Sequence, residues 1–298
     1  MTQNHPDVQK LKSTALWDQA WQASISQRQA DKKQKPEEGI NRWNKRTREF
    51  AERSAGTKLE PRVQQVLDWF STLDVKLDGT SILDIGAGSG SFALPFARVA
   101  GEVTALEPAL QMAELLQGRA SEAELTNIVI DPEPWETLDI DEKGYRNNFD
   151  LVFASMCPGI NNWETLQKAL HCARRYMFLS FFAGKRENTA IRDLWPRLTG
   201  TEQPAFTLDV FYAQNLLYLH GYSFDFRVFE EKRTVSLNPE QAIAHITKGL
   251  AAYNVPPAEN TEQIVAAYVQ EQTGANDGVM DITSNVRFGH VLVRVEDQ

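Results

Sequence analysis

The sequence predicts an α/β fold, with helices on both faces of a doubly wound, mostly parallel sheet of seven strands. Three observations support this class. Short apolar runs alternate with helical stretches from Ser81 onward, the first run leads into a glycine-rich loop, and a last apolar run closes the chain. Apolar runs without polar alternation are typical of parallel strands that are covered on both faces.

The expected strands and helices follow from these runs in chain order. The strands are expected at 81–85, 102–106, 127–130, 150–154, 176–182, 223–235 and 287–295. The helices between them are expected at 91–100, 110–120, 163–174, 189–198 and 211–220. Two further helical stretches, 239–254 and 261–271, separate the last two strands. We interpret residues 238–284 as a helical cap inserted over a substrate pocket.

The first 60 residues are expected to form a helical arm that is distinct from the domain of residues 61–298. Trp17, Trp21 and Ile25 recur at four-residue spacing, and a similar pattern returns around 43–50. The arm carries 12 Lys and Arg against 8 Asp and Glu, whereas the rest carries 19 against 32. The acidic domain makes nucleic-acid binding an unexpected function. The basic arm either packs on this domain or steers an anionic substrate.

Composition also bears on cellular location and on metals. The longest apolar stretch, Tyr176–Gly184, is about half of the ~20 residues that a bilayer-spanning helix needs, and the first residues carry no apolar signal core. The two cysteines, Cys157 and Cys172, are too few for a disulfide framework, and no Cys/His spacing is typical of a zinc site. We therefore expect a cytoplasmic protein with no metal and no membrane partner.

The most informative segment is SILDIGAGSGSF, residues 81–92. An apolar strand carries Asp84 near its end and leads into Gly86, Gly88 and Gly90, and a helix follows. Glycine allows positive φ angles and lets a ligand approach the backbone closely. Glu107 follows the next expected strand, where a carboxylate can accept hydrogen bonds from both hydroxyls of a ribose. The segment therefore predicts a nucleoside site.

The glycine spacing discriminates between nucleoside-binding folds. Dinucleotide folds place glycines at the first, third and sixth positions, whereas here Ser91 holds the sixth position. The triphosphate signature G-x-x-x-x-G-K-[ST] is absent from the sequence. Both a nicotinamide-dependent oxidoreductase and a triphosphate-binding enzyme are therefore disfavoured.

LDIGAGSG and the downstream Glu107 resemble the first two motifs of the class I S-adenosylmethionine-dependent methyltransferases, which have a Rossmann-like fold. The resemblance covers roughly residues 60–235 and the final strand. It implies S-adenosyl-L-methionine as cofactor, with the methionine part held by Asp84 and the glycine-loop backbone, and the ribose held by Glu107. The full set of implied cofactor-binding residues is Asp84, Gly86, Ala87, Gly88, Gly90, Glu107, Pro108, Pro134, Trp135, Ser155 and Met156.

One of these implied positions, Trp135, has an alternative role. In the family, the loop after the third strand flanks the adenine, which would place Pro134 and Trp135 beside the base; Trp135 could instead fill the core. The loop after the fourth strand reads Ser155-Met156-Cys157-Pro158-Gly159. It departs from the Asn-Pro-Pro-Tyr sequence of relatives that methylate adenine or amides, which disfavours those acceptors.

Substrate-side residues are less defined by the sequence. The segment Trp43–Arg53 is similar to a helix that closes over the cofactor in several small-molecule methyltransferases, with Trp43, Arg46 and Phe50 as lid candidates; a plain packing helix is the alternative. Cys157 is either a nucleophile or a structural thiol. Tyr212 is a further substrate candidate and, with His171 and His220, a possible base, but none of the three is assigned as catalytic.

The sequence therefore predicts an S-adenosylmethionine-dependent methyltransferase that acts on a small molecule. Two alternatives stay open: an RNA or protein methyltransferase that uses the basic arm, and a cofactor-binding module without catalysis. The acceptor atom could be oxygen, nitrogen, sulfur or carbon.

Overall fold

The computed structural model describes residues 10–31, 40–41, 43–44, 60–184, 186–203, 210–253, 255–256, 258–274 and 278–296. The chain divides into two compact units. The first contains the described residues within 1–181, 210–227 and 290–298, and the second contains those within 182–209 and 228–289.

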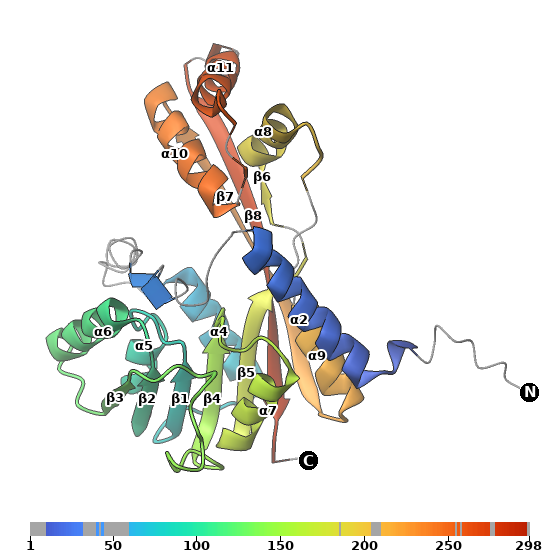
Figure 1. Cartoon of the computed structure of the whole chain (residues 1–298). Coiled ribbons are helices and arrows are strands. Elements are labelled where there is room, and N and C mark those ends of the chain that lie inside the picture. Colours follow the sequence, from blue (N-terminus) through green and yellow to red (C-terminus); the bar gives the residue numbers. More distant parts are fainter. Residues whose placement is uncertain are drawn as a thin grey trace, which may run out of the picture. The chain divides into compact units, whose positions relative to one another are not determined.

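The first unit is built on parallel strands in the order β3-β2-β1-β4-β5 (Figure 1). Their bounds are Ser81–Ile85 for β1, Glu102–Leu106 for β2, Ile128–Asp131 for β3, Phe149–Ser155 for β4 and Ala173–Phe182 for β5. Strand β8, Met280–Arg294, continues the sheet beside β5, and β7, Phe224–Leu237, pairs with β8. The order reverses direction at β1, so the carboxyl ends of β1 and β4 flank the switch point where ligands bind in such sheets.

Several helices accompany this sheet in the described part of the first unit. Those with complete bounds are α2 (Thr14–Asp31), α4 (Pro61–Thr72), α5 (Ala93–Ala97), α6 (Leu110–Glu122), α7 (Trp163–Cys172) and α9 (Val210–Leu219). Proline at its first position starts α4, and a capping box between Asn162 and Thr165 starts α7. Aromatic packing fills the core, where the rings of Phe153 and Phe178 stack with centroids 4.5 Å apart.

The first helix of the predicted arm is an integral part of the first unit. Helix α2 lies along α9 (Figure 1), and Trp21 is only 1% exposed, with its ring against Phe181. Asp18 accepts a 2.7 Å hydrogen bond from the N–H of Trp163, at the start of α7. Of the second predicted arm helix, only Trp43 and Asn44 lie within the described residues.

The second unit combines α8 (Thr189–Thr199), α10 (Pro239–Ala252) and α11 (Thr261–Gly274) with the remaining parts of β7 and β8. A two-residue strand, β6 (Glu187–Asn188), pairs antiparallel with β8. The hydrophobic core of the second unit includes Ile191, Trp195, Ile246, Tyr268 and Ile282. In neither unit is any described helix long and apolar enough to cross a membrane.

The α/β class, the seven predicted strands and the helices α10 and α11 between the last two strands are confirmed. Three details of the prediction are wrong. The sheet has an eighth strand, β6, which is too short for a recognisable pattern. Helix α7 ends at Cys172 and β5 begins at Ala173. Arg174, which was predicted to end the helix, is therefore a strand residue, and its side chain reaches Asp150. Strand β8 begins at Met280 rather than at residue 287.

The early start of β8 is hidden by its polar sequence. On β8, Asp281 accepts a hydrogen bond from Ser236 of β7, and the hydroxyl of Thr283 is hydrogen-bonded to that of Thr234, also on β7. These polar cross-strand pairs stabilise the ribbon without the apolar alternation by which strands are recognised in a sequence.

Candidate functional site

The glycine loop between β1 and α5 is held against the end of β2. The N–H groups of Gly86 and Ala87 both donate to the carbonyl of Leu106, at 2.9 and 3.0 Å. Gly86, Gly88 and Gly90 have φ angles of +76°, +58° and +87°. Side chains with a Cβ rarely adopt these angles, so the loop requires its glycines.

The three glycines differ in their surroundings. A Cβ at Gly86 would lie 2.8 Å from Cys157 Sγ, and one at Gly90 would lie 2.3 Å from Leu116 Cδ1. A Cβ at Gly88 would meet no atom within 4 Å. Packing therefore explains two of the glycines, whereas Gly88 borders open space where a ligand can approach the backbone.

Glu107 ties this loop to helix α6. Its Oε2 accepts a 2.7 Å hydrogen bond from the N–H of Gly88, and its Oε1 accepts a 2.8 Å bond from the N–H of Ala109. The side chain is 7% exposed, and burial raises its pKa, although both N–H groups favour the charged form. Pro108 lies between the two ends of this connection and is half-buried.

Asp84, near the end of β1, is a buried carboxyl group with an unused oxygen. It is 2% exposed, and among the described residues its Oδ2 has no hydrogen-bond partner. Its pKa is raised to about 8, chiefly by burial and then by the charge of Glu107, while the N–H of Ala93 acts in the opposite direction. Asp84 therefore carries a proton at neutral pH. The carboxylate of the neighbouring Glu107 instead accepts hydrogen bonds from two backbone N–H groups.

The loop after β4 adjoins the glycine loop. Ser155 accepts a hydrogen bond from the guanidinium group of Arg62 on α4, and Met156 has a φ angle of +57°. Cys157 is 4% exposed, and burial raises the pKa of its thiol to about 12. At neutral pH this thiol is protonated, so the structure favours the structural role of Cys157 over the nucleophilic one.

Trp135 packs against α7. The indole is 3% exposed, its Nε1 donates to the carbonyl of Thr165 at 3.1 Å, and Lys168 Nζ lies 4.6 Å from the ring centroid. These contacts give Trp135 the packing role that the sequence left open. A contact between the adenine and Pro134 or Trp135 stays a prediction.

The remaining predicted residues are distributed over the first unit. Trp43 and Tyr212 are both half-buried, and Arg46 and Phe50 lie outside the described residues. The ring of His220 stacks on Trp163, with centroids 3.8 Å apart and planes 1° apart, and burial lowers its pKa. Burial also lowers the pKa of His171, at the end of α7. The geometry assigns no catalytic base among them.

Four residues near the predicted site could not be identified from the sequence. Arg62 contacts Ser155, Arg119 donates to the carbonyl of Ser89, and Glu60 accepts from the hydroxyl of Ser91. His290 on β8 is fully buried against Trp69 and Phe178, and burial lowers its pKa to about 3. The contacts of all four cross between distant segments, so no local motif marks them.

Residues 82–177 match a family model described as a methyltransferase domain. Among solved structures, a protein from Bacillus halodurans with a provisional methyltransferase assignment is 12% identical, with a TM-score of 0.50, covering 77% of this chain and 98% of that one. The YcgJ protein from Bacillus subtilis is 13% identical, with a TM-score of 0.49, covering 79% and 98%. Magnesium protoporphyrin IX methyltransferase from Synechocystis, with bound S-adenosylmethionine, is 19% identical, with a TM-score of 0.41, covering 57% and 71%.

The comparison with curated proteins gave no match. The family match, the strand order and the glycine loop define a Rossmann-like methyltransferase domain.

Proposed function

We propose that this chain is an S-adenosylmethionine-dependent methyltransferase that acts on a small-molecule acceptor and holds its cofactor with the glycine loop, Asp84 and Glu107. One observation carries the cofactor site: Glu107 bridges the N–H groups of Gly88 and Ala109, directly beside the open space at Gly88. The remaining implied cofactor residues, Pro108, Pro134, Trp135, Ser155 and Met156, belong to the same proposal.

The residues present fit the chemistry of this cofactor. The methionine part carries an ammonium group, and Asp84 Oδ2 is a buried oxygen that lacks a hydrogen-bond donor among the described residues. The ribose carries two hydroxyls, for which a carboxylate at the end of β2 is a suitable acceptor. Gly88 leaves its backbone accessible from the open side. The donor and acceptor groups of the site are therefore complementary to those of the cofactor.

Bound S-adenosylmethionine supplies an electrophilic methyl carbon on a sulfonium. The contribution of the chain is to orient the acceptor in line with that carbon and to exclude water. Ser155 and Met156, fixed at the end of β4 by Arg62 and by the 2.8 Å bond from the N–H of Met156 to the carbonyl of Ser180, border the cofactor loop. Cys157 fills the space beside Gly86 and takes no part in bond formation.

The packing of the arm supports a small acceptor. Helix α2 uses Trp21 and Asp18 to pack within the first unit, so this part of the basic arm is not an extension available to a polymer. The lid residues Trp43, Arg46 and Phe50, the acceptor residue Tyr212, and the division into arm, domain and helical cap belong to the same proposal.

Calorimetric titration with S-adenosylhomocysteine tests the cofactor site. We expect Glu107→Ala to weaken binding by about 100-fold or more, because it removes charge-assisted hydrogen bonds from a buried carboxylate. Glu102→Ala, at the exposed start of the same strand, is the matched control and should bind like the wild type. Equal affinity in Glu107→Ala and wild type would contradict the site.

Incubation with radiolabelled S-adenosylmethionine and a cell extract tests the acceptor class. Label in the fraction of small molecules supports the proposal. Label confined to RNA or protein would replace it with the macromolecular alternative, and no transfer to any fraction would favour the non-catalytic module.

A further inference from the structure

Two charged residues hold the glycine loop from outside the motif that defines it. Arg119 Nη1 on α6 donates to the carbonyl of Ser89 at 3.0 Å. The hydroxyl of Ser91 donates to Glu60 Oε1 at 3.2 Å. These contacts fall on the two serines that alternate with Gly88 and Gly90, so they fix the segment in which positive φ angles are concentrated.

Arg119 belongs to a face of α6 that is fitted to the loop. Leu116 is three residues earlier and therefore lies on the same side of the helix. Its Cδ1 occupies the space that the missing side chain of Gly90 leaves, 2.3 Å from where a Cβ would be. The helix begins just after Ala109, whose N–H is bound by Glu107. Helix α6 thus contacts the loop directly through Leu116 and Arg119, and Glu107 joins the loop to the residue that precedes the helix, Ala109.

The side chain of Glu60 contacts the loop rather than the first turn of its own helix. Glu60 precedes the first residue of α4, Pro61, at the position where some side chains accept a hydrogen bond from an N–H of the first turn. Here it makes no side-chain capping bond and accepts from Ser91 instead. The negative charge of Glu60 also acts on Arg119: burial, the larger effect, lowers the pKa of Arg119, and Glu60 raises it.

We propose that Arg119 and Glu60 are positioning residues that fix the glycine loop in its cofactor-binding form, through the Ser89 carbonyl and the Ser91 hydroxyl. This inference rests on the proposed function of the loop. Glycines lose more backbone entropy on ordering than other residues, so an unsupported loop would have to be ordered by the cofactor itself. Contacts that order the loop beforehand increase affinity without touching the ligand.

The test is calorimetric titration of the full chain with S-adenosylhomocysteine. We expect Arg119→Gln to weaken binding about tenfold and Glu60→Gln about threefold, within the range of about two- to tenfold that the net loss of one ordinary hydrogen bond gives. The double variant should lose less than the product of the single losses, because the two residues act on one loop. Arg119→Lys, which keeps a cationic donor, should recover part of the affinity.

Two matched controls separate the loop contacts from general charge effects. Arg98→Gln removes an exposed cation at the end of α5. Glu122→Gln removes a charge that acts on Arg119 from the exposed end of α6. Both should bind like the wild type.

Amide hydrogen exchange distinguishes positioning from a general structural role. In Arg119→Gln, protection should fall at Ser89–Ser91 and stay unchanged in β4 and β5; a uniform fall would overturn the inference. Unchanged affinity in both Arg119→Gln and Glu60→Gln would overturn it as well. Absence of binding in the wild type would instead contradict the proposed function.

Discussion

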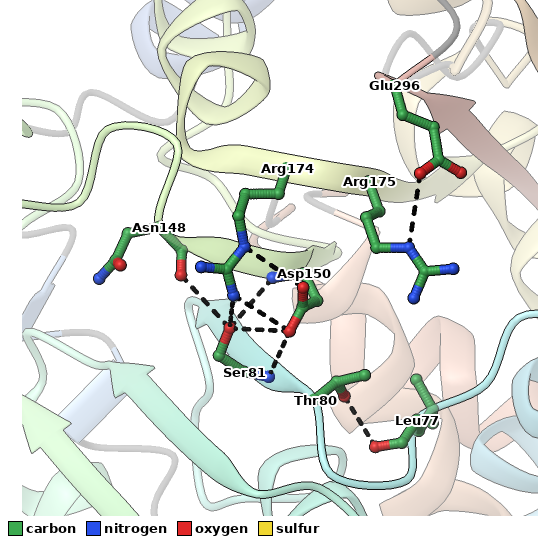
Figure 2. A network of polar contacts seen from close by, with 8 residues as sticks. All are labelled: Leu77, Thr80, Ser81, Asn148, Asp150, Arg174, Arg175 and Glu296. Atoms are coloured by element: carbon green, nitrogen blue, oxygen red, sulfur yellow. Dashed lines mark hydrogen bonds and ion pairs between the residues drawn. The ribbon is translucent and has the colours of Figure 1, made fainter.

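The polar groups at the two ends of strand β1 differ in their hydrogen bonding. The strand has five residues and begins with Ser81, whose hydroxyl lies at the centre of a polar network (Figure 2). Near its other end is Asp84, one of whose oxygens has no partner among the described residues. Both ends belong to the same parallel sheet, so we compare the amino edge of its strands with the carboxyl edge.

At the amino end, the polar groups satisfy one another. Asp150 Oδ2 accepts from both the N–H and the hydroxyl of Ser81, at 2.9 and 3.1 Å. Arg174 donates to Ser81 Oγ at 2.8 Å and to Asp150 Oδ1 at 3.3 Å (Figure 2). Burial alone would raise the pKa of Asp150, but the N–H of Ser81 and the guanidinium of Arg174 outweigh it and lower the pKa. This network connects β1, β4 and β5.

At the carboxyl end, buried oxygens are left without partners in the described structure. They are Asp84 Oδ2, Ser89 Oγ and, on β5, Ser180 Oγ. A buried polar group without a hydrogen bond costs about 1–3 kcal/mol, and folded proteins concentrate such groups at functional sites. The amino edge therefore joins the strands, and the unpartnered oxygens of the carboxyl edge support the proposal that a ligand binds there.

The largest expected effect is on folding stability, which should depend on pH because of the raised pKa of Asp84. Its pKa of about 8 in the folded protein lies above the ordinary 3.8, so the folded state binds the proton more tightly. The stability that this proton contributes is present below pH 4 and is lost as pH rises through 8. At about 1.36 kcal/mol per pKa unit, the loss amounts to several kcal/mol.

Denaturant unfolding of Asp84→Asn measures this loss. The variant carries no titrating group at this position, so its stability relative to the wild type should increase between pH 4 and pH 9. A cationic ligand favours ionised Asp84, so wild-type affinity for S-adenosylmethionine should rise with pH through 8, and that of the variant should not. A constant difference in stability across this range would show that Asp84 ionises normally.

A second, smaller effect separates packing from backbone conformation at Gly86. We expect Gly86→Ala to destabilise the protein by about 3 kcal/mol, because it combines a left-handed conformation with overpacking against Cys157. Gly79→Ala has a similar φ of +67° but no atom within 4 Å, so only the conformational cost of about 1 kcal/mol applies.

Chemical unfolding of both variants checks this expectation. The added methyl at position 86 should be less damaging in a Cys157→Ala background, where the Sγ contact at 2.8 Å is gone and the contacts with Cβ at 3.2 Å and Cα at 3.7 Å persist. Equal stability of Gly86→Ala and Gly79→Ala would mean that Cys157 moves aside without resistance.

The sequence could predict the parts of the site whose signals are local. The run of Asp84, Gly86, Gly88 and Gly90 between an apolar strand and a helix predicted a nucleoside loop, and the structure shows the positive φ angles that make glycine necessary there. The doubly wound, mostly parallel sheet was predicted from the alternation of apolar runs and helical stretches. These features depend on neighbouring residues, so a single sequence contains them.

The remaining features depend on packing between distant segments. Arg119 and Ser89 are 30 positions apart, and Arg62 and Ser155 are 93 apart, so no spacing rule connects them. Trp135 could be read as a stacking surface or as core, and only its bond to Thr165 indicates the packing role. The polar start of β8 was hidden because its partners are polar residues of β7.

A third expected effect concerns Gly88, at the carboxyl end of β1 where the loop borders open space. Gly88→Ala keeps the N–H that donates to Glu107, and its methyl meets no atom within 4 Å, so stability should fall only about as much as in Gly79→Ala, by about 1 kcal/mol. The methyl would occupy the space from which the cofactor approaches. We therefore expect affinity for S-adenosylhomocysteine to fall at least about tenfold, measured by calorimetry. Wild-type affinity in Gly88→Ala would place the ligand elsewhere.

The smallest effect tests the amino edge. Asp150→Asn should lower stability by about 1 kcal/mol at neutral pH, because the Arg174 side chain is 40% exposed and solvent screens the pair. The pKa of Asp150 is lowered, so its contribution is present above pH 4 and is lost as pH falls, the opposite sign to Asp84. Affinity for S-adenosylhomocysteine should be unchanged. If Asp150→Asn weakened binding while Asp84→Asn did not, the satisfied network would be part of the ligand site, and the unused oxygens at the other edge would have no ligand to complete them.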